Sequence, residues 1–295
     1  MKTLIIGSNG QLGWELVRQG NLMGLPLRAV DFPDIDITRP DSVVEWITGD
    51  TNLVVNAAAY TAVDRAESER ELAFAVNHAG PEYLSVACAR HHIPLIHIST
   101  DYVFDGTRQA PYRESDPVAP MGVYGKSKSA GEAAVRAGLK RHVIVRTAWL
   151  CGEHGQNFVK TMLRLCREKE TLRVVNDQHG CPTFAFDLAE AILKIVRDIL
   201  SGKTDAWGTY HYCGRGETTW YGFTREIVRL AKEHTDLKVH TLEPITTEEY
   251  PTPARRPRYS VLDCHRIEET FGIINKPWQD GLDRLIRRLF AAENR

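Results

Sequence analysis

Tyr124 and Lys128 are the residues of this chain whose types and spacing most directly predict chemistry. They stand four positions apart, so on a helix both side chains lie on one face, one turn apart. A free tyrosine has a pKa of about 10 and exchanges protons poorly at neutral pH, but a nearby ammonium lowers that value. The pair therefore predicts a general acid for a carbonyl oxygen that gains charge. One such spacing in 295 residues also arises by chance, and an exposed helix with an unrelated Tyr and Lys is the ordinary alternative.

The composition is that of a globular protein with a sizeable core, because 43% of the 295 residues are hydrophobic and 25% are charged. The formal net charge of -1 argues against nucleic-acid binding, which favours a basic excess. The N-terminal apolar run is short and ends at Gly7, so neither a signal peptide nor a membrane-spanning segment is expected. We therefore expect a cytoplasmic protein that binds neither nucleic acid nor a membrane.

The six cysteines are scattered and form no Cys-x-x-Cys motif. This pattern favours reduced thiols over a disulfide framework or a zinc site. His211 and Cys213 are a possible pair of metal ligands, but no second pair lies nearby in the sequence. No metal is predicted.

Three glycines follow the first predicted strand, residues 2–6, and are followed at once by a helical pattern: Gly7, Gly10 and Gly13. Strand, glycine turn and helix in this order indicate a dinucleotide-binding unit, in which a pyrophosphate lies at the helix N-terminus. The spacing is Gly-x-x-Gly-x-x-Gly, a variant of the usual fingerprint. Asp31 ends the second strand, residues 27–30, where an acidic residue meets ribose hydroxyls; a simple loop aspartate is the alternative.

Further strands at 52–56, 94–98 and 143–147 alternate with predicted helices at 40–47 and 69–91 and around Tyr124. Such alternation predicts a doubly wound parallel sheet. Ligands of these sheets bind beyond the carboxyl ends of the strands, where this chain has small and hydroxyl residues. They are Ala57, Ala58, Ala59, Tyr60 and Thr61 after the third strand, and Ser99, Thr100 and Asp101 after the fourth. A tight strand-to-helix crossing would also use the alanines.

After Thr147 the alternation fades. We predict a dinucleotide-binding domain over 1–148, to which 184–208 returns, and a substrate domain over 149–183 and 209–295. The predicted elements there are helices at 158–167, 185–200, 220–234 and 278–290 and a strand at 209–213. A basic loop, residues 251–258, has Arg255 and Arg256 as a possible clamp for a diphosphate. Taken alone, it is better explained as a solvated charge cluster.

Several motifs spread over nearly the whole chain carry a family resemblance: 7–13, 56–64, 99–106, 124–128, 146–149, 176–183, 218–221 and 251–257. As a set they resemble the extended short-chain dehydrogenase/reductases, and more narrowly those that act on dTDP-4-dehydro-L-rhamnose. The resemblance implies an α/β fold, a Rossmann-type doubly wound parallel sheet with a smaller C-terminal α+β substrate domain. It also implies NAD(P)H-dependent reduction of the C4 ketone to dTDP-L-rhamnose, the last step of that sugar's biosynthesis.

The resemblance assigns roles by position. Tyr124 donates the proton to O4, Lys128 lowers the tyrosine pKa and binds the nicotinamide ribose, and Thr100 bonds the substrate oxygen. The implied cofactor contacts, besides Tyr124 and Lys128, are Gly7, Gly10, Gln11, Leu12, Gly13, Asp31, Asp36, Ile37, Ala58, Ala59, Tyr60 and Thr61. The implied contacts of the dTDP-sugar are Thr100, Asp101, Trp149, Asn157, Arg255 and Arg256.

The chain departs from the family pattern at Cys151, where an aromatic residue is common, and at His179-Gly180-Cys181. Neither departure removes a catalytic group. Some relatives bind a metal at a dimer contact with acidic residues, one equivalent to Glu15, but a full set cannot be traced here. We expect a monomer or a homodimer without a metal.

Two other functions remain open. A reductase-like fold also serves as a non-catalytic regulatory subunit, although intact Thr100, Tyr124 and Lys128 argue against that. The chain is also compatible with a reductase, epimerase or dehydratase of another nucleotide 4-keto sugar, but Tyr102 stands where dehydratases have a second carboxylate. Both NADPH and NADH are expected, because Asp31 repels a 2′-phosphate while Arg28 and Arg39 offset that repulsion.

Overall fold

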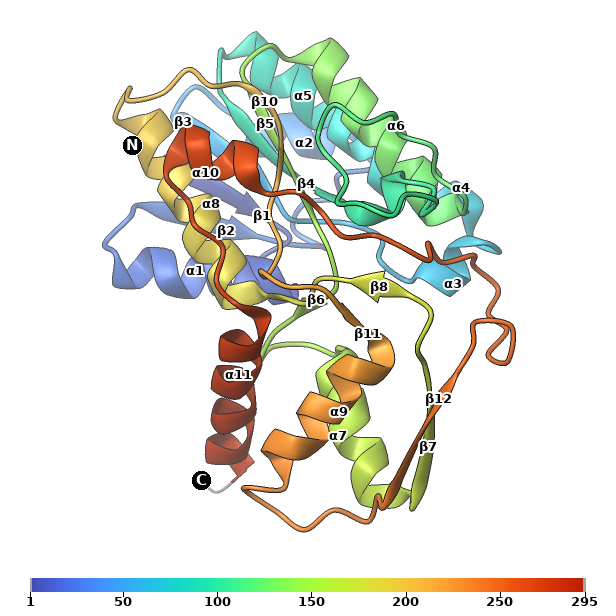
Figure 1. The fold of residues 1–295 in the computed structure, drawn as a ribbon. Coiled ribbons are helices and arrows are strands. Elements are labelled where there is room, and N and C mark those ends of the chain that lie inside the picture. Colours follow the sequence, from blue (N-terminus) through green and yellow to red (C-terminus); the bar gives the residue numbers. More distant parts are fainter. Residues whose placement is uncertain (1, 294–295) are drawn as a thin grey trace.

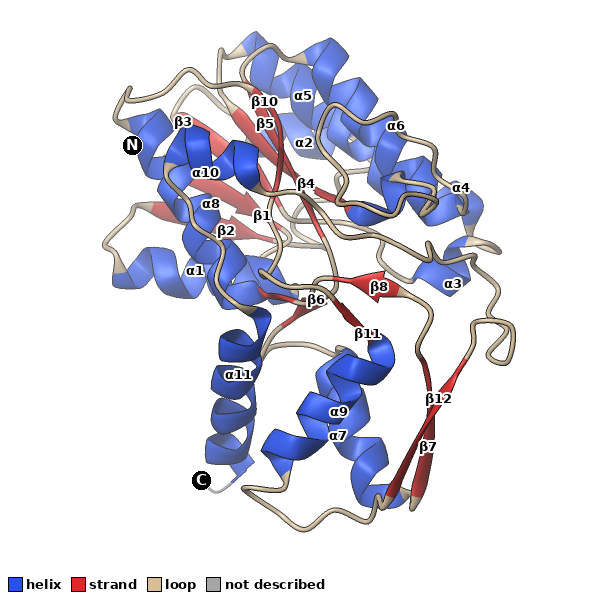
Figure 2. Cartoon of the chain, viewed as in Figure 1, coloured by secondary structure: helices blue, strands red, loops and turns tan. Residues whose placement is uncertain are grey.

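A six-stranded parallel sheet forms the centre of the molecule in a computed structural model that describes residues 2–293 (Figures 1 and 2). The strand order is β10-β5-β4-β3-β1-β2. The strands are β1 (Lys2–Ile6), β2 (Leu27–Val30), β3 (Thr51–Asn56), β4 (Leu95–Thr100), β5 (His142–Thr147) and β10 (Gly208–His211). The order reverses direction between β1 and β3, which is where doubly wound sheets bind their ligands.

The strands are apolar runs because both faces of the sheet are covered. Successive residues of β1 alternate between the two faces, so Ile5 belongs to one buried cluster while Leu4 and Ile6 belong to the other. The helices of the first cluster are α1 (Gln11–Leu22), α8 (Ala185–Leu200) and α10 (His265–Phe271). The helices of the second cluster are α2 (Pro40–Trp46), α5 (Gly80–Arg90) and α6 (Val123–Gly138).

The segment predicted as one helix over 69–91 consists of three consecutive pieces, which follow the short α3 (Val63–Ala66). They are α4 (Arg70–Phe74), a π-helical turn η1 (Ala75–Ala79) and α5. The π-turn holds the buried Asn77, whose amide donates to the hydroxyl of Ser127 at 3.0 Å and to the carbonyl of Tyr60. The turn therefore ties the chain after β3 to α6.

A second lobe lies beyond the carboxyl edge of the sheet (Figure 1). It comprises α7 (Phe158–Glu168), α9 (Trp220–Ala231) and α11 (Trp278–Glu293), packed around one apolar cluster, with the parallel pair β7 (Thr171–Val175) and β12 (Thr241–Ile245). Short strands lie between this lobe and the sheet: β6 (Leu150–Cys151), β8 (His179–Gly180), β9 (Thr183–Phe184) and β11 (Thr218–Thr219). A 3-10 turn, η2 (Asp101–Val103), follows β4 directly.

The chain passes between the sheet and the second lobe more than once. β10 pairs with β5, and α10 packs on the same sheet. Residues 209–295, which include α10 and nearly all of β10, were however predicted from the sequence to belong to the substrate domain. We therefore propose that the dinucleotide-binding domain includes these two elements besides 1–148 and 184–208. None of the helices in residues 2–293 has the length and apolar character needed to cross a membrane.

Candidate active site

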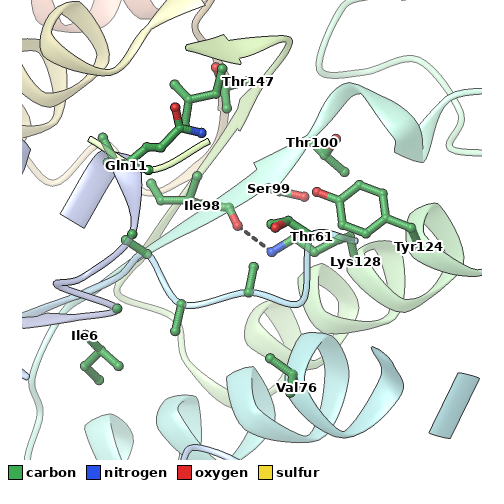
Figure 3. Close-up of a pocket in the computed structure, with 18 of the residues that line it drawn as sticks. Ile6, Gln11, Thr61, Val76, Ile98, Ser99, Thr100, Tyr124, Lys128 and Thr147 are labelled. Atoms are coloured by element: carbon green, nitrogen blue, oxygen red, sulfur yellow. Dashed lines mark hydrogen bonds between the residues drawn. The ribbon is translucent and has the colours of Figure 1, made fainter. Parts of the chain in front are cut away.

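A cavity of about 830 Å³ opens at the carboxyl edge of the sheet and collects most of the residues predicted from the sequence (Figure 3). The predicted residues that line it are Gly7, Gly10, Gln11, Leu12, Asp31, Asp36, Ile37, Ala58, Ala59, Thr61, Thr100, Asp101, Tyr124, Lys128, Trp149 and Asn157. Most of them follow the carboxyl ends of β1, β2, β3, β4 and β5, and the others lie at the starts of α1, α6 and α7. Parallel strands bring these distant segments to one edge.

Tyr124 and Lys128 lie in the first two turns of α6, as their spacing predicts. Figure 3 shows the phenol oxygen of Tyr124 directed toward Ser99 and Thr100. The ammonium of Lys128 donates to the carbonyl of Ile98 at 2.7 Å, which fixes the end of this long side chain in the lining of the cavity (Figure 3). Lys128 is almost fully buried.

The expected lowering of the tyrosine pKa by Lys128 is not seen. Burial raises the pKa of Tyr124 to about 12, a hydrogen bond with Thr100 lowers it, and the Asp101 carboxylate raises it further. Burial also lowers the pKa of Lys128 to about 8, opposed by Glu132 one turn along α6. Desolvation disfavours both charged forms, so it outweighs the attraction on which the prediction rested.

Asp101 is buried beside Thr100, whose hydroxyl donates to the carboxylate at 3.0 Å. Burial raises the pKa of Asp101 to about 6, although hydrogen bonds from Ser260 and Thr100 act in the opposite direction. The hydroxyl oxygen of Thr100 also accepts from the backbone N–H of Tyr102 at 3.2 Å. Asp101 therefore orients the Thr100 hydroxyl.

A buried ion pair that sequence reasoning missed lies below Lys128. Arg146 of β5 donates to both carboxylate oxygens of Glu132, at 2.8 and 2.7 Å, and contacts His211 of β10 at 3.3 Å. Burial raises the pKa of Glu132, but the Arg146 bonds outweigh it and hold that pKa below its usual value. The pair joins α6 to two strands of the sheet. Its only sequence signal is a Glu four positions after Lys128.

The glycine loop requires glycine at two positions. Gly7 has a φ of +84°, and a Cβ there would stand 2.5 Å from the backbone N of Ala58. A Cβ on Gly13 would stand 2.0 Å from the carbonyl oxygen of Gly7. Gly10 is the N-cap of α1 and provides no side-chain cap, so the N–H groups of the first turn face the cavity unbonded to a side chain. An uncapped helix N-terminus beside a close backbone turn fits a pyrophosphate.

The two aspartates that were predicted to contact the cofactor line the cavity and also accept hydrogen bonds from neighbouring residues of the protein. Asp31 accepts from the backbone N–H of Asn9 at 2.7 Å and of Phe32 at 2.8 Å, so its carboxylate shapes the glycine loop. Asp36 accepts from the backbone and hydroxyl of Thr38 at 3.0 and 2.6 Å. Loop capping, the alternative given for Asp31, is thus present in both.

Four predicted residues do not line this cavity: Gly13, Tyr60, Arg255 and Arg256. Tyr60 donates to Glu69 at 2.6 Å instead. Arg255 and Arg256 line a second cavity, of about 860 Å³, and Arg256 donates to Asp64 at 2.8 Å. The loop that was predicted to clamp a diphosphate therefore lies apart from the Tyr124 pocket, and one of its arginines is already paired.

Trp149 has a φ of +48°, and its indole stacks on Trp220 with ring centroids 3.4 Å apart. A Cβ on Gly180 would stand 2.5 Å from the Trp149 ring, so the indole is enclosed on that side as well. Asn157 caps α7 by accepting from the N–H of Lys160, and its amide donates to Gln11 at 3.0 Å. These contacts join the second lobe to the start of α1.

The sequence reasoning left several lining residues out of the predicted site. They are Ile6, Asn9, Phe32, Ile35, Thr38, Val63, Val76, Ile98, Tyr102, Thr147, Ala148, Leu150, Gly155 and Gln156. Most stand next to a predicted residue, so extending each strand end by a residue or two would have found them. Val76 is different, because only the π-turn brings its side chain to the pocket. Within residues 2–293 no three His, Cys, Asp or Glu side chains are arranged to hold a metal.

Comparison with known proteins adds independent information. Residues 1–290 match the family model described as the RmlD substrate binding domain. A dTDP-4-dehydrorhamnose reductase of Aggregatibacter actinomycetemcomitans is 42% identical over 287 residues, which are 96% of this chain and 98% of that protein. The crystal structure of a dTDP-4-dehydrorhamnose reductase from Clostridium acetobutylicum has a TM-score of 0.91 and 41% identity, covering 98% and 99% of the two chains. The Bacillus anthracis enzyme, solved in complex with NADP, has a TM-score of 0.89 and 38% identity, covering 97% and 99%.

Proposed function

The chain belongs to the RmlD family of dTDP-4-dehydrorhamnose reductases, and on that premise we propose that Tyr124, Lys128 and Thr100 are the residues with which it performs the family's reaction. That reaction is the NAD(P)H-dependent reduction of the C4 ketone of dTDP-4-dehydro-L-rhamnose to dTDP-L-rhamnose. The observation that carries the assignment is that these three side chains share one cavity with the glycine loop and the uncapped end of α1.

Reduced nicotinamide supplies the hydride for C4 when it is bound. The residues that would hold its dinucleotide are those of the glycine loop, the α1 N-terminus and the alanines after β3, because they line the cavity beside an uncapped helix N-terminus and carry small side chains. The crystal structure of the Bacillus anthracis relative with NADP supports this choice of cofactor. NADH remains part of the proposal as an alternative donor.

Tyr124 acts as the proton donor to O4. Because burial raises its pKa to about 12, the phenol is neutral near pH 7 and its proton is available as the ketone oxygen gains charge. A hydrogen bond with Thr100 lowers the pKa of the same phenol and so opposes the effect of burial. A general acid of this kind typically contributes about 10²–10⁴-fold in rate.

Lys128 holds a positive charge below the reacting centre. Its bond to the Ile98 carbonyl fixes the ammonium at the carboxyl end of β4, and Glu132 favours its protonated form. A fixed cation adds positive potential to the site in which the ketone oxygen gains negative charge. We further propose that the ammonium bonds the ribose of the nicotinamide half of the cofactor.

The sugar nucleotide is proposed to lie between the two lobes, with Asp101, Trp149 and Asn157 toward the sugar. Arg255, which lines the second cavity and is exposed, is the better candidate for the diphosphate, since Arg256 is paired with Asp64. The pair with Asp64 holds Arg256, and with it the loop that carries Arg255.

Tyr102 weighs against a dehydratase on the same scaffold. It follows Asp101, and its ring meets that of Tyr124 edge-on with centroids 5.5 Å apart. A second acid is needed there to assist loss of a sugar hydroxyl, and a buried phenol whose pKa burial raises far above neutrality is a poor substitute.

The assay that tests the function follows loss of NADPH absorbance when dTDP-4-dehydro-L-rhamnose is added. Matched reactions with UDP- and GDP-linked 4-keto sugars test the nucleotide, and dTDP-glucose with NAD⁺ tests dehydration. Turnover of the dTDP 4-keto sugar with formation of dTDP-L-rhamnose is expected. A purified, folded protein that binds NADPH but reduces none of these ketones would support a regulatory role instead.

We also propose a cytoplasmic location, supported by six cysteines that are all free thiols. The oligomeric state stays a prediction of monomer or homodimer, which light scattering on the purified protein checks.

A further inference from the structure

Two cysteines that stand far apart in the sequence lie in contact where the second lobe joins the sheet. The Sγ atoms of Cys213 and Cys264 are 3.6 Å apart, and both are within 4 Å of the carbonyl oxygen of Leu262. The backbone N–H of Cys213 donates to the sulfur of Cys264 at 3.3 Å. The two side chains therefore point at one another, and a disulfide requires the sulfurs to approach by a further ~1.5 Å.

We propose that Cys213 and Cys264 are a peroxide-sensitive dithiol that closes into a disulfide and joins the two chain segments that connect the second lobe to the central sheet. The sequence argument against disulfides rested on the scattered positions of the cysteines. Such an argument cannot detect a contact between residues that stand 51 positions apart. No part of the proposed reductase chemistry uses either thiol.

The two sulfurs differ in access, which sets the order of events. Cys264 is partly exposed, whereas Cys213 is buried within an apolar cluster with Cys181. Hydrogen bonds with Cys181 and Cys264, together with burial, raise the pKa of the Cys213 thiol well above its usual value. Cys264 is therefore the thiol that meets the oxidant, and Cys213 is the resolving thiol.

The chemistry balances with one hydrogen peroxide. The Cys264 thiolate attacks a peroxide oxygen, the O–O bond breaks, and a sulfenic acid and hydroxide form; the hydroxide takes up the proton that Cys264 lost, giving water. The sulfur of Cys213 then attacks the sulfur of the sulfenic acid, the S–O bond breaks, and the hydroxyl leaves with the Cys213 proton as a second water. Two thiols and one hydrogen peroxide thus give one disulfide and two waters.

The position in the chain gives the disulfide its effect. Cys213 follows β10, where the chain leaves the sheet, and Cys264 directly precedes α10, where the chain returns to it. The intervening residues contain β11, α9 and β12. A bond between the two ends restricts this segment in the unfolded state and so stabilises the fold.

The test treats the full-length protein with hydrogen peroxide, digests it with trypsin without reduction, and analyses the peptides by mass spectrometry. Tryptic peptides 204–215 and 259–266 each contain a single cysteine, Cys213 and Cys264. The expected product is these two peptides joined, at two hydrogens below their summed mass, and separated again by a thiol reductant. Peroxide should also raise the thermal midpoint by on the order of 5 °C.

Two variants complete the test. Cys264→Ser, at the partly exposed position, should abolish both the joined peptide and the thermal shift, while Cys181→Ser should retain both. Three results would overturn the proposal. They are over-oxidation of Cys264 without a cross-link, a cross-link between Cys181 and Cys213, and a cross-link that leaves the thermal midpoint unchanged.

Discussion

Tyr124 and Lys128 are each held in an environment that disfavours their charge, and this decides which forms take part in the reaction. The buried phenol is neutral well above pH 7, whereas the buried ammonium loses its proton near pH 8. With the roles proposed for this pair, the working state has a protonated tyrosine and a charged lysine. That combination exists only below the pKa of Lys128.

Replacing Tyr124 with Phe should reduce kcat by about 10²–10⁴-fold while leaving NADPH affinity within a few-fold of wild type. Phe keeps the ring and its edge-on contact with Tyr102 and removes only the proton. Steady-state kinetics and fluorescence titration of NADPH measure the two quantities. Tyr221→Phe, in α9 of the second lobe, is the matched control. Turnover within about threefold of wild type would exclude Tyr124 as the acid.

The pH dependence of kcat should show an alkaline limb near pH 8. Lys128 has a pKa lowered to about 8, so its charge is present below that pH and is lost as the pH rises through it. Glu132→Gln removes the carboxylate that opposes this shift and should move the limb to lower pH, whereas Lys128→Met should remove the limb and weaken NADPH binding. A limb that stays in place in Glu132→Gln would show that another group titrates.

For individual residues, the sequence predicted which residues belong to the site better than it predicted which other residues they contact. Asp31 was expected at a ribose, and its carboxylate also holds the N–H of Asn9. Trp149 was expected near the sugar, but its stacking partner Trp220 lies 71 positions further along the chain. Contacts of this kind depend on the packed fold and leave no local pattern.

Helix α6 places Tyr124 in its first turn, and the segment after β3 holds that turn in position. The backbone N–H of Val123 donates to the Glu67 carboxylate at 2.8 Å, while Asn77 in the π-turn bonds Ser127. A carboxylate at a helix N-terminus satisfies a free N–H and complements the helix dipole. The order of the first turn of α6 therefore depends on a residue outside the pocket.

Glu67→Gln should destabilise the protein by about 0.5–1 kcal/mol and lower kcat more than it changes NADPH affinity, because the first turn of α6 carries the acid. Thermal denaturation and steady-state kinetics give both values. Glu71→Gln, at an exposed position in α4, is the control and should change neither. Equal stability and equal kcat in the two variants would show that Glu67 does not hold the first turn of α6 in position.

Gly13→Ala should abolish detectable NADPH binding and destabilise the fold by about 1–3 kcal/mol, because the new methyl group would press on the carbonyl of Gly7. Gly49→Ala, where nothing lies within 4 Å of the new Cβ, should leave both properties intact. Isothermal titration and chemical denaturation compare them. Normal NADPH affinity in Gly13→Ala would mean that the loop does not approach the cofactor closely.

The elements that the sequence predicted well are those with long apolar runs: β1, β3, β4, β5 and α8. Two-residue strands such as β6 and β8 have no periodicity to detect, and they form only because the second lobe folds against the sheet. The strand β12 contains Pro244, which reads as a break in a strand pattern. The segment is a strand because it pairs with β7, and the pattern of a single segment carries no information about its pairing partner.

The two lobes are joined by an ion pair near both cavities. Arg256 in the loop after β12 donates to Asp64 in α3, and a hydrogen bond with Tyr102 connects the same arginine to the residue that packs on Tyr124. The loop of the second lobe is thus held against the cofactor side of the molecule.

Asp64→Asn should raise the KM for the sugar nucleotide by roughly 3–10-fold, about 1 kcal/mol or slightly more, with little change in NADPH affinity. The pair is partly exposed, so global stability should fall by less than about 1 kcal/mol. Glu168→Gln, which breaks the exposed pair with Arg164 in α7, serves as the comparison. A change confined to the thermal midpoint would assign the pair a purely structural role.

The path of the chain through the sheet also determines the order in which a ribosome completes it. Five strands have been synthesised by Thr147, but the helix that covers one face, α8, spans Ala185–Leu200, and the sixth strand ends at His211. At roughly 5–20 residues per second, synthesis from Thr147 to the end of α8 takes about 3–11 seconds. Throughout it, the sheet face that carries Ile5 and Val55 lacks the side chains of α8 that bury it in the finished protein. Until α8 has left the ribosome, the emerging chain therefore exposes apolar surface of the kind that chaperones bind.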